Sequence, residues 1–458
     1  MHRLQAAAAF LLLALIVVAP VPLGSARDWA WAPLAALVGV VLLVQAVAQS
    51  ERDDAHRPAV GDLLASFLAV GAATLWALAQ TLPSDLFGPV NALLSSAKEA
   101  LAQPSPPRIA TDIEQSMTGI MRLLTYCGIF WLSTQFGRDT KFAKQLTRGL
   151  VASAVLVTVY GFIMQIDNRS CVVINVVKAP IGSSCAFSGT FRNADNYATF
   201  AALGALICVA EVYGRLLSID SSTTSARQRL RARLGILSGG GGVLLGALIV
   251  LVGGLFLSGS KAGAPSFLGA CLAMILILNG AQRRRSRAAI VSLVTLVAFA
   301  LAMLAVSGEM LVTRLVALIN FGDADRIALY SLSLEAIALH PWVGWGVGSF
   351  EGVFSVLQPA SIKLVYTQAH NTYLESAIEL GIPAACLLVL SVALPAARCA
   401  LGVFQRKKDA HYPALGFGAA VLVGLHSLVD FSIQIPAIAV AFSAILGLGW
   451  AQSQSSRL

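Results

Sequence analysis

The sequence predicts an all-α polytopic membrane protein, and three observations support this fold class. Hydrophobic residues make up 57% of the 458 residues and charged residues only 12%, whereas about a quarter of the residues in a soluble domain are charged. The mean hydropathy is +0.77. Apolar runs of about 20 residues, the length that crosses a bilayer, recur along the chain. These observations exclude a soluble enzyme, a disordered chain and a nucleic-acid-binding module.

Twelve apolar runs are expected to form transmembrane helices within a single membrane domain, 1–458. The segment 1–26 resembles a secretory signal, but because the chain is polytopic we interpret it as an uncleaved first span. The expected spans lie at 4–23, 30–48, 61–82, 115–135, 149–166, 197–217, 236–257, 263–280, 288–306, 371–396, 412–430 and 437–452.

The distribution of Lys and Arg predicts the orientation of these spans. With the N-terminus in the cytoplasm, 21 of the 32 Lys and Arg residues fall in inward-facing connections or at the cytoplasmic ends. Membrane proteins carry an excess of positive charge on the cytoplasmic side. We therefore expect both termini in the cytoplasm.

Two long outward loops are expected to carry special features. Loop 307–370 contains a helix-like run from Asp325 to Leu339 and a turn-rich segment at 340–350, and long ordered loops often carry function. Loop 167–196 contains Cys171 and Cys185, for which a disulfide is plausible on the oxidising side of the membrane. The other five cysteines lie in or beside spans, and no Cys/His cluster predicts a metal site.

Three basic residues near the outer surface are candidate anion ligands. Arg192, just before the sixth span, can hold a phosphate or sugar hydroxyls, or it can snorkel to lipid headgroups. Lys261 lies in a Ser-Gly-Ser-Lys-Ala-Gly turn whose small residues let a bulky anion approach; its alternative role is an interfacial anchor. Arg326 opens the helix-like run and either clamps an anion or pairs with Asp323 and Asp325.

His370 is the strongest catalytic candidate, because an imidazole at the outer end of the tenth span can accept a proton from a hydroxyl near neutral pH. Helical spacing places Glu375 on one face with Asn371 and Glu379. About the helix axis, Glu375 points about 140° away from His370, so the spacing does not support a His–Glu dyad. Glu379 is expected about 13 Å deeper than His370. Such a residue is functional by default, although pairing with Arg122 is equally consistent with its depth.

His426 and Asp430 are four residues apart on the last outward turn of the eleventh span. This spacing permits a pair that orients a group near the same surface. A histidine that only packs between helices is the more common situation.

Several segments occur together in a familiar order: GTFRN at 189–193, SGSKAG at 258–263, the run from Asp325 through HPWVGWGVGSF at 340–350, and HNTYLESAIELG at 370–381. With them the chain resembles the O-antigen ligase and polymerase superfamily of bacterial surface-polysaccharide enzymes. The motifs cover about 188–381, and the remainder resembles the family only in topology.

The resemblance implies a metal-independent, inverting glycosyltransferase of the bacterial inner membrane with a periplasmic active site under loop 307–370 and no cofactor. The donor would be a glycan on undecaprenyl diphosphate. His370 would be the base that activates the acceptor hydroxyl, while Arg326 and Lys261, with Arg192 as a further candidate, would hold the diphosphate. Family members commonly have arginine where Lys261 stands, and lysine lacks the bidentate fork.

Other functions remain open at this point. A ligase that uses lipid A-core and a polymerase that uses another repeat unit share this donor chemistry, and a protein O-oligosaccharyltransferase is a less favoured relative. A flippase for the lipid-linked sugar would place polar residues near the bilayer midplane, whereas here they cluster at the outer ends of spans. A non-catalytic assembly subunit would not need His370. The expected partners are the lipid-linked donor, the glycan acceptor and the bilayer, without nucleic acid.

Overall fold

The computed structural model describes residues 2–50, 60–83, 108–166, 187–222, 239–281, 324–359, 366–406 and 408–454, with six further residues between 225 and 235. All the regular structure in these residues is helical, which confirms the all-α class. The helices are α1 (His2–Val18), α2 (Asp28–Ser50), α3 (Val60–Thr81), α5 (Ile113–Phe136), α6 (Thr140–Ile166), α7 (Ala194–Ser222), α9 (Gly240–Leu257), α10 (Gly263–Ala281), α13 (Ala324–Leu339), α14 (Phe350–Leu357), α15 (Thr372–Leu380), α16 (Ile382–Gln405), α17 (His411–His426) and α18 (Pro436–Ala451), with 3-10 turns at Leu23–Ser25 and Ser432–Gln434.

Seven helices among the described residues are long and apolar enough to cross a membrane: α2, α3, α6, α7, α9, α10 and α16. The helices α1 and α18 are apolar but shorter. The expected span at 288–306 and the expected disulfide between Cys171 and Cys185 lie outside the described residues. The multi-pass character is therefore confirmed, and the count of twelve spans stays a prediction.

The helix α18 occupies the centre of the bundle. Nearly all its residues are buried, and it packs against α5, α7, α16 and α17. Glycine permits this close packing, as small residues do between membrane helices. A Cβ on Gly449 would lie 2.7 Å from the Cα of Gly416, and a Cβ on Gly447 would lie 2.6 Å from the carbonyl oxygen of Phe130.

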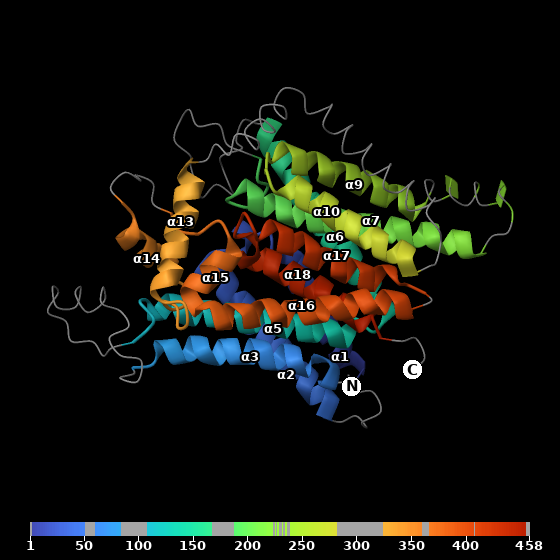
Figure 1. Ribbon diagram of the computed structural model, residues 1–458. Helices are drawn as coiled ribbons and strands as arrows, with labels where there is room; N and C mark the ends of the chain where they lie inside the picture. The colour runs from blue at the N-terminus through green and yellow to red at the C-terminus, as the bar shows by residue number, and fades with distance from the viewer. Residues whose placement is uncertain are drawn as a thin grey trace.

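The long helices run side by side, and a group of shorter helices covers one end of the bundle (Figure 1). There α13 stands across the direction of the bundle, with α14 and α15 beside it. Both termini lie toward the opposite end. This arrangement separates the termini from α13–α15, as the sequence predicts, while the assignment of the two ends to cytoplasm and periplasm stays a prediction.

The expected span at 371–396 is wrong in its bounds. The chain forms a short helix, α15, and then breaks at Gly381, whose φ of +78° favours glycine. The apolar span is α16, which begins at Ile382. Similarly, α17 ends at His426 instead of 430, so Asp430 lies in the turn after it. By contrast, the helix expected from Asp325 to Leu339 agrees with α13.

A glycine-rich turn between α13 and α14 holds the end of α15. The backbone N–H groups of Trp345 and Gly346 donate to the carbonyl oxygens of Ile378 (2.9 Å) and Glu379 (2.8 Å). Gly344 has a φ of +70° and lies against the backbone of Glu379 and Gly381, where a side chain does not fit. The turn therefore fixes α15 from outside the bundle.

Replacement of Gly344 by alanine is expected to destabilise this end of the protein. A left-handed conformation costs a non-glycine residue about 1–2 kcal/mol, and the added Cβ collides with the α15 backbone. We expect a lower melting temperature for the purified protein in detergent. The control is Gly352→Ala in α14, where a Cβ meets nothing within 4 Å. Equal melting temperatures for the two variants would contradict the role of the Gly344 turn in holding α15.

Candidate active site

The centre of the candidate site is a close approach between His370 and Asp430. The Nδ1 atom of His370 lies 3.4 Å from Oδ1 of Asp430, and the two side chains are 25% and 2% exposed. The rings of Tyr366 and Phe431 stand edge-on to the imidazole, with centroids 6.4 and 5.1 Å away. Because Nδ1 faces the carboxylate, Nε2 is the nitrogen left to act as a base.

The backbone around His370 is fixed by contacts from three sides. His370 has a φ of +49°, which is uncommon for a residue with a side chain. The Glu375 Oε2 atom accepts a hydrogen bond from the N–H of Ala369 (2.8 Å), and the hydroxyl of Tyr330 donates to the carbonyl oxygen of His370 (3.1 Å). The side chain of Asn371 caps α15 by accepting hydrogen bonds from the backbone N–H groups of Tyr373 and Leu374. Neighbouring groups thus impose the conformation that aims the imidazole.

Asp430 is held by a buried network that reaches α7. The hydroxyl of Ser432 donates a short hydrogen bond to Oδ2 of Asp430 and lies 3.1 Å from Oδ1 of Asn196. His426 approaches Oδ2 only to 3.9 Å. Burial raises the pKa of Asp430, but the hydrogen bonds from His370 and Ser432 outweigh it, so the net pKa lies below its usual value. The carboxylate is therefore ionised next to His370 at neutral pH.

The His426–Asp430 pair expected from spacing is thus the longer of the two histidine contacts made by Asp430. The Nδ1 atom of His426 lies 3.3 Å from the hydroxyl of Thr199 on α7, and His426 is 1% exposed. His426 therefore supports the packing of α17 against α7, while His370 makes the closer contact with Asp430.

The three candidate cations come from three different segments. Arg326 is half-buried on α13, one helical turn before Tyr330. Burial raises the pKa of the Tyr330 hydroxyl, the charge of Arg326 lowers it and the charge of Asp430 raises it. Arg326 and Asp430 thus both lie near Tyr330, whose hydroxyl contacts His370.

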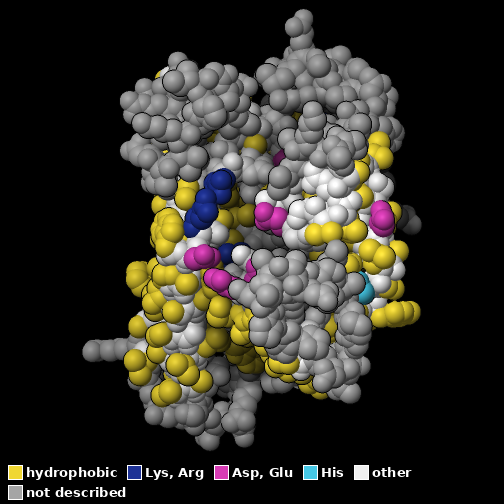
Figure 2. Space-filling view, turned by 90° about the vertical axis from the view of Figure 1, so that its left-hand side faces the viewer, with side chains coloured by type: hydrophobic (Ala, Val, Ile, Leu, Met, Phe, Trp, Pro, Cys, Tyr) yellow, Lys and Arg dark blue, Asp and Glu magenta, His cyan; other side chains and the backbone are white. Residues whose placement is uncertain are grey.

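Arg192 and Lys261 are exposed and flank the first turns of α7. Arg192 lies two residues before α7 begins. The turn that carries Lys261 packs on α7, since a Cβ on Gly263 would lie 2.8 Å from the Cβ of Ala198. The view onto the α13–α15 end of the molecule shows Lys or Arg and Asp or Glu side chains around a hollow, above a hydrophobic flank (Figure 2).

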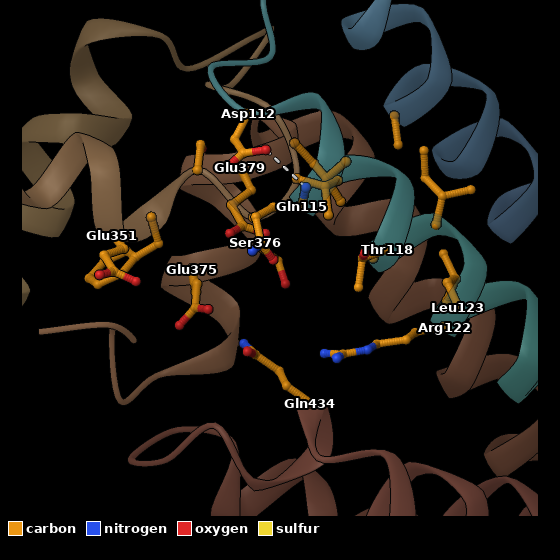
Figure 3. Close-up of a pocket in the computed structure, with 18 of the residues that line it drawn as sticks. Asp112, Gln115, Thr118, Arg122, Leu123, Glu351, Glu375, Ser376, Glu379 and Gln434 are labelled. Carbon is orange, nitrogen blue, oxygen red and sulfur yellow. Dashed lines mark hydrogen bonds between the residues drawn. The ribbon is translucent and has the colours of Figure 1, made fainter. Parts of the chain in front are cut away.

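A cavity of about 820 Å³ lies on the inner side of α15. Glu375 and Glu379 line it from α15, Arg122 reaches into it from α5 and Gln434 from the 3-10 turn (Figure 3). Glu379 is therefore not an isolated residue deep in a span, as the sequence suggests, because α15 is a separate helix outside the spans. Arg122 shares the cavity with Glu379, but its guanidinium lies 3.8 Å from Asp28.

Burial raises the pKa of Glu375 to about 8 and that of Glu379 to about 7. The charge of Glu379 raises the pKa of Glu375 further. Hydrogen bonds from Ala369 and Gln434 to Glu375, and from the backbone of Gly348 and Phe350 to Glu379, oppose these shifts. The two carboxyl groups are consequently at least partly protonated near neutral pH and can both donate and accept hydrogen bonds.

Sequence patterns alone do not indicate Tyr330, Ser432 and Gln434, which also contribute to the site. They have no motif of their own, and the turn around Ser432 follows His370 only after α15, α16 and α17. The available signal was the polarity of residues 430–434 between two apolar runs. No group of three or more His, Cys, Asp or Glu side chains within the described residues is placed to hold a metal ion.

Residues 246–389 match the family model described as O-antigen ligase. Over this segment the chain is similar to the O-antigen ligase family. This match confirms the resemblance to the O-antigen ligase and polymerase superfamily. The matched segment includes Lys261, Arg326 and His370, whereas Arg192, His426 and Asp430 lie outside it. No curated protein sequence matches the chain significantly.

The raised pKa of Glu375 predicts a pH-dependent stability. The folded protein favours the neutral carboxyl group. The contribution of Glu375 to the stability of the folded state is therefore complete below the ordinary pKa of a glutamate and is lost as pH rises toward about 8. We expect the melting temperature to fall between about pH 5 and about pH 8.5, and to fall less in Glu375→Gln. Glu335→Gln on the exposed face of α13 is the control; an equal fall in all three proteins would refute the assignment.

Proposed function

We propose that this protein is a membrane glycosyltransferase that moves a glycan from undecaprenyl diphosphate to an acceptor hydroxyl. The match of residues 246–389 to the O-antigen ligase family supports a membrane enzyme of polysaccharide biosynthesis in general. The observation that carries the specific proposal is the His370–Asp430 contact, at the same end of the bundle as Arg326. We further propose that this end faces the periplasm and that the protein lies in the bacterial inner membrane.

In the proposed reaction, Nε2 of His370 takes the proton of the acceptor hydroxyl as its oxygen bonds to the anomeric carbon. The bond from that carbon to the diphosphate oxygen breaks, and the lipid diphosphate leaves with the electron pair. Asp430 holds the imidazole through Nδ1 and stabilises the imidazolium that forms, as an ionised carboxylate does beside a histidine base. Attack from the face opposite the leaving group inverts the anomeric configuration.

The leaving group gains negative charge on its diphosphate oxygens, and cations stabilise that charge best where water is partly excluded. Arg326 is suited to this role, because it is half-buried and lies on the α13 face that also carries Tyr330. Lys261 and Arg192, exposed beside α7, would guide the lipid diphosphate as it enters from the outer leaflet. A flippase is less well supported, because these polar groups gather at one end of the bundle.

Replacement of His370 by alanine is expected to reduce transfer by about 10²–10⁴-fold, the usual contribution of a general base. Asp430→Asn should also reduce transfer, since an amide cannot stabilise the imidazolium. The measurement uses purified protein with undecaprenyl-diphosphate oligosaccharide, with and without lipid A-core. Product from donor alone indicates a polymerase, and product only with lipid A-core a ligase.

The control for this assay is His340→Gln, at the same end of the molecule, where His340 packs edge-on against Trp345 and not against Asp430. It should retain most of the transfer activity. Wild-type turnover by His370→Ala would exclude His370 as the base.

Arg326→Ala is expected to weaken donor binding and slow transfer, and Arg326→Lys to restore part of the loss, because lysine keeps the charge without the bidentate fork. The comparison is the KM for the lipid-linked donor and the kcat of both variants. Glu335→Gln on the same helix is the control. An unchanged KM and kcat for Arg326→Ala would remove this residue from the diphosphate site.

A further inference from the structure

The cavity beside α15 is separate from the groups assigned to the reaction. It is lined by Gln115, Thr118 and Arg122 of α5 on one wall and by Ser376 of α15 on the other. None of His370, Arg192, Lys261 and Arg326 is among the lining residues. A volume of about 820 Å³ lies within the range of ligand pockets, about 300–1,000 Å³.

The charged groups of this cavity are mostly acidic. Four carboxyl groups line it, from Asp112, Glu351, Glu375 and Glu379, against the single guanidinium of Arg122. A phosphate group in this position would meet the carboxylates of Asp112 and Glu351 in a partly enclosed site, and those of Glu375 and Glu379 as they ionise, which is costly. The cavity therefore does not suit the lipid diphosphate.

Four buried polar side-chain atoms on the lining have no partner among the described residues: Nε of Arg122, the hydroxyl of Tyr126, the hydroxyl of Ser349 and the side-chain oxygen of Gln368. Ser349 is 2% exposed, and its hydroxyl makes no hydrogen bond in the described part of the chain. The side-chain oxygen of Gln368 is likewise buried and unpaired there. Buried polar groups normally have hydrogen-bond partners. These atoms include both donors and acceptors, which indicates a ligand that supplies hydroxyl groups.

The cavity meets the reacting centre beside His370. Gln368 and Thr372, two residues before and after His370, both line it. Arg326, in contrast, lies on α13 near Tyr330, whose hydroxyl contacts His370 from outside the cavity. A displacement with inversion needs the acceptor and the leaving group on opposite sides of the anomeric carbon. The cavity and Arg326 belong to different elements near His370, so they can hold the acceptor and the diphosphate separately.

We propose that this cavity binds the acceptor glycan through its hydroxyl groups and selects uncharged sugars over phosphorylated ones. The assignment of the bound glycan as the acceptor rests on the proposed function. Within that function, it favours an acceptor end without phosphate groups, such as a neutral repeat unit. The apolar floor formed by Ala73, Ala77 and Leu388 offers a surface for the C–H faces of sugar rings.

The test measures binding directly, independently of transfer. The full-length protein in lipid nanodiscs is titrated with the repeat-unit oligosaccharide released from the surface polysaccharide of its host, and with the same oligosaccharide carrying a terminal phosphate. We expect the neutral form to bind about tenfold more tightly or better. Thr118→Trp, which fills the cavity from α5, should abolish binding, and Met121→Trp, on the exposed face of α5, should not.

A second pair of substitutions tests the charge selection without filling the cavity. The double variant Asp112→Asn, Glu351→Gln should narrow the preference for the neutral form, because it removes two carboxylates and keeps the polar groups. Its melting temperature and donor binding should match those of the wild type.

Equal or tighter binding of the phosphorylated form would overturn the proposal, as would unchanged binding by Thr118→Trp or the absence of binding by the wild-type protein. Oligosaccharide binding that Thr118→Trp abolishes, in a protein that transfers nothing from the lipid-linked donor, would leave the cavity assignment standing and refute the proposed glycosyl transfer. Displacement of the oligosaccharide by detergent or free fatty acid, but not by excess neutral oligosaccharide, would assign the cavity to an acyl chain and overturn the proposal.

Discussion

The architecture of the site depends on one buried carboxylate. Asp430 lies in the turn between α17 and α18. It contacts His370, which precedes α15, and it is linked through Ser432 to Asn196 of α7. Segments that are distant in sequence therefore meet at a single charge. An ionised group in such a place is tolerated only when several donors satisfy it, so any displacement of α7, α15 or α17 disturbs the imidazole.

Much of the architecture follows from the sequence, because hydrophobic length is a strong signal. Eleven of the twelve expected spans coincide wholly or partly with a described helix, and α13 agrees within one residue at its start. The error at 371–396 has a definite cause. Residues 372–380 carry an amphipathic pattern that continues into apolar residues, and only the positive φ of Gly381 divides the run. Composition does not distinguish a glycine that ends a helix with a left-handed conformation from a glycine that is tolerated inside a helix.

The site was predictable in part. His370, Asn371 and Arg326 stand in recognisable motifs, and the structure gives each a definite setting. The pairing of His370 with Asp430 was not predictable, since helical spacing connects residues four apart and favours His426 as the partner of Asp430. Likewise the cavity depends on polar residues of α5, a helix that the chain leaves long before it forms α15. Contacts between distant segments are set by packing, and single-residue patterns do not encode them.

The central position of α18 has a consequence for how the bundle assembles. Its neighbours α5, α7, α16 and α17 all precede it in the chain, and its glycines fit against surfaces that these helices must already present. Until α18 is synthesised and inserted, those surfaces face lipid or one another. The earlier helices can therefore reach only a loosely packed intermediate, and the turn that carries Asp430 closes when α18 inserts.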